Sequence, residues 1–190
     1  MQLSPSDYLP DREHCALLII DIQERLSAAM PPDVLPGVVR NARILVETAR
    51  EFNLPVYVSE QYPKGLGPTV AEIREGLADG NRPIEKMVFS CCAESAFQPV
   101  FSQSGARSWI LCGMETHVCV LQTALDLLQQ GQRVYIAADA CSSRTEFNWR
   151  TGLDVMRQAG AVIGSTEMFA FGLLGAGGTE SFKRISKLVK

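Results

Sequence analysis

The stretch SWILCGMETHVCVLQTALDLLQQG, residues 108–131, decides the fold of this 190-residue chain. It begins with a short apolar run that is typical of a buried parallel strand. Val118, Leu121 and Leu125 then recur at the spacing of an amphipathic helix. A cysteine, Cys119, therefore stands about one turn inside a helix that directly follows a strand.

The position of Cys119 suits a nucleophile. Thr116 can cap the predicted helix, which would leave Cys119 among the free amides of the first turn. There the positive end of the helix dipole favours thiolate over thiol and lowers the cysteine pKa. An unpaired cysteine is more often a small buried hydrophobic residue, so position alone leaves both interpretations open.

Apolar strand patterns alternate with helical patterns along the rest of the chain. We expect strands at residues 16–21, 55–59, 86–90, 108–113, 133–138 and 161–165. We expect helices at residues 36–52, 69–78, 94–103, 117–130, 147–159 and 179–188. Strands as uniformly apolar as LLII require a parallel sheet covered on both faces. The prediction is one α/β domain over residues 1–190, a three-layer αβα sandwich with a mostly parallel six-stranded sheet in the Rossmann-like order 3-2-1-4-5-6.

Composition excludes several classes of partner. The formal net charge is −3 with both signs interspersed, so we expect no nucleic-acid or membrane-surface binding. No secretion signal and no membrane-spanning run is apparent, which predicts a cytoplasmic protein with its six cysteines reduced. Two histidines cannot form a histidine-rich metal cluster, so no metal is expected.

The predicted strand order places chemistry at one edge of the sheet. Ligands of such sheets bind at the carboxyl ends of the strands, where the strand order reverses. Asp21 ends the first strand and Cys119 follows the fourth, its neighbour across that switch point. Residues 21–25 contain no glycine, the chain has no phosphate-binding GxxxxGK[ST] motif, and it has no GxSxG elbow. We therefore expect no nucleotide cofactor, no other cofactor and no catalytic serine.

Four segments in order along nearly the whole chain support a resemblance to a known family. They are LIIDIQ (18–23), KMVFS (86–90), GMETHVCV (113–120) and DACSSR (139–144), the last leading into a helix that ends in MRQAGA (156–161). In these segments the chain resembles the isochorismatase-like cysteine hydrolases, a family that includes isochorismatases, nicotinamidases and N-carbamoylsarcosine amidases.

The resemblance implies a catalytic triad of Asp21, Lys86 and Cys119. The Lys86 ammonium would stabilise the thiolate and the ionised Asp21, while Asp21 would take the thiol proton and later give it to the leaving amine. Lys86 starts its predicted strand, although strand starts lie at the opposite edge, so the strand must begin earlier or the chain must bend. The resemblance also implies a cis peptide before Glu115, whose amide would form an oxyanion hole with that of Cys119.

The substrate is predicted only as a class, a small amide or related C–N compound. The segment SEQYPKGLG (59–67) holds no histidine, which disfavours a metal-dependent nicotinamidase and resembles the stand-alone isochorismatase-domain subgroup. Gln61, Tyr62, Phe89 and Phe169 are candidate substrate-binding residues, although packing explains each equally well. A vinyl-ether hydrolase with Asp21 as general acid and a non-catalytic scaffold protein remain alternatives.

Assembly is the last expectation from the sequence. The tract MFAFGLL (168–174) is too apolar to be left in water, although packing within the monomer explains it almost as well. With the family resemblance, this predicts a homo-oligomer, a tetramer or larger, that buries part of the tract.

Overall fold

A single parallel sheet forms the centre of the computed structural model, which describes residues 4–78 and 80–190. Within these ranges six strands lie in the order β3-β2-β1-β4-β5-β6, and every neighbouring pair is parallel, as the sequence predicts. The strands are β1 (Cys15–Ile20), β2 (Val56–Gln61), β3 (Ile84–Lys86), β4 (Ser108–Met114), β5 (Arg133–Ser142) and β6 (Val162–Gly164).

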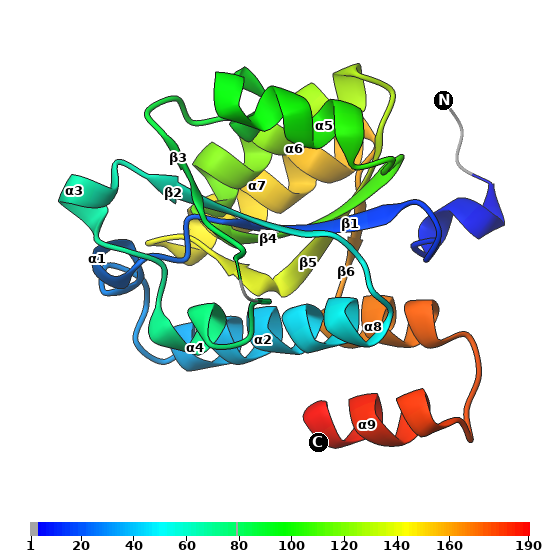
Figure 1. Ribbon diagram of the computed structural model, residues 1–190. Coiled ribbons are helices and arrows are strands. Elements are labelled where there is room, and N and C mark those ends of the chain that lie inside the picture. Colours follow the sequence, from blue (N-terminus) through cyan, green and yellow to red (C-terminus); the bar gives the residue numbers. More distant parts are fainter. Residues whose placement is uncertain (1–3, 79) are drawn as a thin grey trace.

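Helices cover both faces of the sheet (Figure 1). One face carries α5 (Gln98–Gln103), α6 (Leu121–Gln129) and α7 (Glu146–Ala159). The other carries α2 (Leu35–Glu51), α4 (Ala71–Arg74) and α8 (Thr166–Leu174), with α9 (Glu180–Leu188) outside them. Two short helices, α1 (Glu24–Ser27) and α3 (Pro63–Leu66), follow β1 and β2 near the carboxyl edge. Every residue of β1 is buried, because helices shield both of its faces.

A glycine allows β1 and β4 to approach closely at their carboxyl ends. Gly113 is paired with Ile20 and has a φ of 134°. A Cβ atom at Gly113 would lie 1.9 Å from the carbonyl oxygen of Ile20, so no other residue fits without movement. The backbone turns sharply at Asp21, the residue that follows β1. Its φ is 54°, a value that aspartate tolerates better than most residues.

Several predicted elements differ from the structure at their boundaries. The strand expected at 133–138 extends to Ser142, and the helix expected at 94–103 begins as α5 only at Gln98. The strand expected at 86–90 is instead β3, which ends at Lys86, and Met87, Val88 and Phe89 are exposed in the loop beyond it. An apolar run that lines a loop cannot be distinguished from a strand by periodicity alone. The helix expected at 69–78 shortens to α4, which ends just before the helix-breaking Gly76.

The apolar tract 168–174 forms helix α8, which the sequence pattern did not predict. Met168 is half exposed, but Phe169, Ala170 and Leu173 are buried inside the monomer. The argument that this tract needs a partner subunit is therefore wrong, because α8 packs against α2 and β5 instead.

Candidate active site

Asp21, Lys86 and Cys119 meet at the carboxyl edge of the sheet. Asp21 directly follows β1. Lys86 ends β3 instead of starting it, so it lies at the carboxyl edge of the sheet with Asp21. Cys119 lies in the turn η4 (Thr116–Val120), which follows β4. Since β2 separates β1 from β3, the long Lys86 side chain reaches across β2 to Asp21.

Asp21 and Lys86 form a buried ion pair. The Lys86 Nζ atom lies 2.7 Å from Asp21 Oδ2, and both side chains are 0% exposed. The other carboxylate oxygen of Asp21 accepts a hydrogen bond of 2.7 Å from the Ser59 hydroxyl. A buried pair of this kind is stable only when hydrogen bonds satisfy its remaining atoms, and Ser59 supplies one of them.

The Lys86 ammonium has acceptors for all three of its N–H groups. Besides Asp21, it donates to Gln61 Oε1 at 2.9 Å and to the carbonyl oxygen of Phe89 at 3.1 Å. Burial by itself would lower the Lys86 pKa, but the charge and hydrogen bond of Asp21, with contributions from Cys119 and Cys91 once those thiols ionise, outweigh it, so this pKa is raised. The lysine is therefore held as a fixed positive charge.

The turn that carries Cys119 differs from the predicted helix start. η4 is a π-helical turn, in which the Val120 amide donates to the Glu115 carbonyl at 3.3 Å, and the α-helix α6 begins only at Leu121. Thr116 does not cap it: among the described residues its buried hydroxyl has no hydrogen-bond partner. π-Helical turns inside helices occur frequently at functional sites.

The pKa of Cys119 is raised to about 12, which overturns the expected depression. Burial is the main cause and the charge of Asp21 adds to it, whereas the Lys86 ammonium acts in the opposite direction. Cys119 is 5% exposed, so the loss of hydration destabilises its thiolate more than the amino end of the helix stabilises it. The thiol therefore keeps its proton at rest, next to a carboxylate that can accept it.

Glu115 connects the turn η4 to the segment that follows β5. The peptide bond between Met114 and Glu115 is cis. The Glu115 carboxylate accepts hydrogen bonds from the backbone amide of Arg144 at 2.9 Å and from its side-chain Nε at 3.1 Å. Arg144, the last residue of the segment DACSSR and just beyond the end of β5, is thus held against the residue that precedes η4.

The four predicted substrate-binding residues do not lie together. Gln61 contacts Lys86, and Tyr62 and Phe89 are exposed beside it. Phe169 is 0% exposed and packs edge-on against Tyr135, with ring centroids 5.5 Å apart. Because Tyr135 lies near the amino end of β5, Phe169 is far along the sheet from Asp21 and serves the core.

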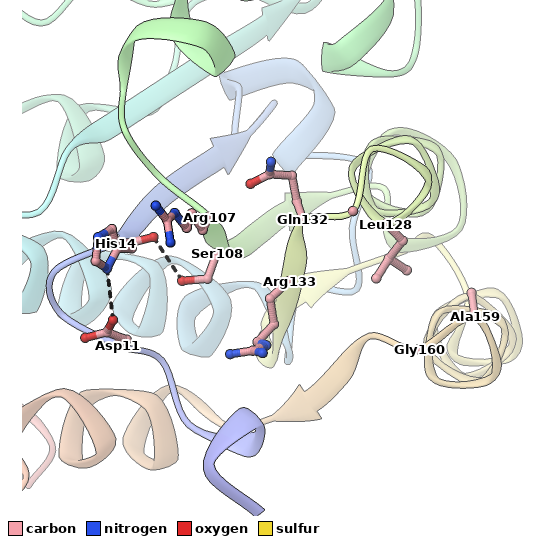
Figure 2. A pocket seen from close by; sticks show the side chains of 10 residues that line it. Asp11, His14, Arg107, Ser108, Leu128, Gln132, Arg133, Ala159 and Gly160 are labelled. Atoms are coloured by element: carbon pink, nitrogen blue, oxygen red, sulfur yellow. Dashed lines mark hydrogen bonds and ion pairs between the residues drawn. The ribbon is translucent and has the colours of Figure 1, made fainter. Parts of the chain in front are cut away.

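Two cavities differ in their relation to this cluster. A cleft of about 260 Å³ reaches Lys86 between Tyr62 and Met87. A second cavity of about 520 Å³ lies at the opposite, amino-terminal edge, where Arg107, Ser108 and Gln132 line it (Figure 2). Neither Asp21 nor Cys119 is among the residues that line this second cavity.

Sequence reasoning missed Ser59 and Cys91, which also adjoin the ion pair. A polar residue near the end of an apolar strand was the available signal for Ser59.

Within the described ranges no group of three or more His, Cys, Asp or Glu side chains could hold a metal ion. The same residues include no helix long and apolar enough to cross a membrane.

The fold and this cluster define a class: a parallel α/β protein with an acid, a lysine and a thiol at the carboxyl edge of its sheet. A family model described as the isochorismatase domain matches residues 15–168, most of the chain. The chain therefore belongs to the isochorismatase family, whose fold it shares.

Curated relatives carry the same domain. The chain is 39% identical over 174 residues to isochorismatase domain-containing protein 2 from Pongo abelii, a match that covers 92% of this chain and 82% of the relative. It is 40% identical over 177 residues to the secreted isochorismatase effector Isc1 from Phytophthora sojae, covering 92% and 83%.

Solved structures extend the likeness to three dimensions. One, described as the MAR1 ribonuclease from Caenorhabditis elegans, has a TM-score of 0.88 and 36% identity, covering 95% of this chain and 91% of that one. Another is the YcaC gene product from Escherichia coli, described as an octameric hydrolase of unknown specificity. It has a TM-score of 0.85 and 24% identity, covering 94% and 89%, which supports the shared fold.

Proposed function

We propose that the chain is a cysteine-dependent hydrolase of a small amide, acting through a thioester on Cys119. The single observation that carries the proposal is the buried Asp21–Lys86 pair, whose charges both act on the Cys119 thiol. A carboxylate, an ammonium and a thiol in one water-poor site are what amide cleavage by a thiol requires.

The chemistry follows from these three groups. Asp21 takes the proton from Cys119 as the sulfur attacks the amide carbonyl, and Lys86 stabilises the developing thiolate. The backbone amides of Glu115 and Cys119 are the proposed donors to the oxyanion. Asp21 then gives its proton to the leaving nitrogen, and the C–N bond breaks. Water, deprotonated by Asp21, cleaves the thioester, releases the acid and restores the thiol.

Three alternatives are weaker on these observations. Vinyl-ether hydrolysis with Asp21 as general acid does not use Cys119. The C. elegans neighbour is described as a ribonuclease, but a formal net charge of −3 offers this chain no electrostatic attraction to RNA. A non-catalytic scaffold needs no charge pair buried against a thiol.

Mass spectrometry of the intact protein tests the proposal. We expect an acyl adduct on Cys119 after incubation with a pool of small primary and secondary amides, because the thioester is an obligatory intermediate. Cys119→Ala should form none, and Cys112→Ala, which removes another buried thiol, should form it normally. Amide hydrolysis that persists in Cys119→Ala would place the chemistry elsewhere, and ether hydrolysis that persists there would favour the second candidate.

We also propose that the chain forms a homo-oligomer, which the octameric description of the E. coli neighbour supports for the fold. We also retain the cytoplasmic prediction, although the Phytophthora relative is described as secreted.

A further inference from the structure

Strand β2 lies directly beneath the Asp21–Lys86 pair. It separates β1 from β3, and Gln61 is the register partner of Lys86 while Ser59 is that of Ile20, the residue before Asp21. Ser59 and Gln61 are two residues apart and therefore point to the same face of the strand. One contacts the acid and the other contacts the lysine.

We infer that Ser59 and Gln61 are positioning residues that keep the catalytic pair charged, each by a hydrogen bond to the ionised form of one member. Ser59 does this for Asp21 and Gln61 does it for Lys86. The meaning of the inference for catalysis rests on the proposed function, whereas its tests do not need a substrate.

Ser59 favours the carboxylate of Asp21 over the carboxylic acid. A hydroxyl has one proton to donate, and at Ser59 it is given to Oδ1 at 2.7 Å. Ser59 is 0% exposed, so water does not replace the hydroxyl if it is removed. Loss of that donor therefore makes the ionised state of Asp21 less stable relative to the protonated state.

Gln61 favours the ammonium of Lys86 over the neutral amine. Its Oε1 faces Lys86 because its Nε2 donates to the Met87 carbonyl at 2.9 Å, and its backbone amide donates to Gln23 Oε1 at 2.8 Å. The amide is thus fixed from two sides with its acceptor toward the lysine. Without that acceptor one N–H of a buried cation lacks a partner.

The other titratable groups near the pair come from different elements. Cys119 faces it from η4, and Cys91 faces it from η2 (Cys91–Ala93). Glu60 points to the opposite face of β2, where the amide and hydroxyl of Thr69 donate to it. None of these three groups is altered by a change at Gln61, whereas Ser59 also contacts the Cys91 thiol, so Ser59→Ala removes that contact together with the one to Asp21.

The first test follows the Asp21 carboxyl carbon by NMR at neutral pH. In Ser59→Ala we expect its signal to move away from the wild-type position, because the carboxylate loses the hydroxyl that donates to Oδ1. Ser59→Thr keeps a hydroxyl and should leave the signal close to its wild-type position. Ser181→Ala is a matched control, because Ser181 donates to the carboxylate of Glu51 on α2.

The second test measures exchange of the Lys86 ammonium protons with water near neutral pH. Exchange passes through the neutral amine, so Gln61→Met should speed it about tenfold or more, while Gln61→Glu, which adds an anionic acceptor, should slow it. Gln132→Met is the matched control, since Gln132 lies at the opposite edge of the sheet (Figure 2). Its Oε1 accepts a hydrogen bond from the indole of Trp109.

An unchanged Asp21 carboxyl signal in folded Ser59→Ala, or equal exchange in the two Gln61 variants, would overturn the inference. If Ser59→Ala does not fold, the Gln61 variants decide alone, because their expected effects have opposite signs. Failure to find an amide substrate leaves both tests intact, so the inference and the proposed function fail separately.

Discussion

Lys86 and Asp21 form an ion pair that has the same 2.7 Å length as the pair between Lys183 and Glu180, but the first is fully buried and the second is exposed. Removing the lysine should therefore have unequal costs. Lys86→Met leaves an unpaired buried carboxylate and should lower the free energy of unfolding at pH 7 by about 3–5 kcal/mol. Lys183→Met should cost about 1 kcal/mol or less. Urea unfolding measures both, and equal losses would contradict the burial argument.

Asp21→Asn should lower amide hydrolysis at least about 100-fold, the low end for a lost general acid and base. Asparagine, like aspartate, tolerates the positive φ at this position, so the backbone turn is retained. Hydrolysis rates and the thermal midpoint should be measured together. Full activity in a folded Asp21→Asn protein would mean that another group takes the thiol proton.

Cys119 should be alkylated by iodoacetamide faster than the other five cysteines. Lys86 opposes the rise in pKa only at Cys119 and Cys91, and of these two Cys119 is 5% exposed and Cys91 is 0% exposed. Cys92 is similarly exposed, at 6%, but has no such lysine. Because the Cys119 pKa is raised to about 12, its rate should increase about tenfold per pH unit from pH 6 to 9. Peptide mass spectrometry measures each site. A rate already level above pH 7 would indicate a low-pKa thiolate, and equal rates at all six sites would remove the special role of Cys119.

Gly113→Ala should be among the most damaging single substitutions, since its methyl group would lie 1.9 Å from the Ile20 carbonyl oxygen. We expect a loss of about 4 kcal/mol or more, or a folded protein in which Asp21 has moved and activity is lost. Gly37→Ala is the control, because nothing lies within 4 Å of a Cβ there. Similar unfolding midpoints for the two variants would show that β1 and β4 separate easily.

Acid should loosen α9 from α2. Hydrogen bonds from Arg184 and Ser181 lower the pKa of Glu51 from 4.5 to about 2. Because the pKa of Glu51 is lower in the folded protein than in the unfolded one, its ionised form stabilises the fold at any pH above the unfolded-state pKa. That contribution is lost as pH falls from ~4.5 toward 2. Thermal midpoints of Glu51→Gln should therefore change less with pH over this range than those of wild type. Glu180→Gln, in an exposed pair on α9, should behave like wild type.

Much of the fold and part of the site could be predicted from the sequence. The parallel sheet follows from apolar runs that alternate with helices, whereas its strand order was assumed from the Rossmann-like pattern and agrees with the structure. The places of Asp21 and Cys119 at strand ends made them candidates, and the family resemblance singled them out. The sign of the Cys119 pKa shift could not be predicted, because it depends on how much water reaches the sulfur. Ser59 was missed for a similar reason: its partner is 38 residues away, and no local pattern records that contact.

The position of β3 has a consequence for local opening of the molecule. This strand has three residues, lies at the border of the sheet and pairs with β2 alone in the described strand order. Such edge segments detach far more readily than central strands such as β1. Each detachment would carry Lys86 away from Asp21, so fraying of this edge and loss of the charge pair are a single equilibrium. Amide exchange in Ile84 and Glu85 would then report how often the Asp21–Lys86 pair is broken.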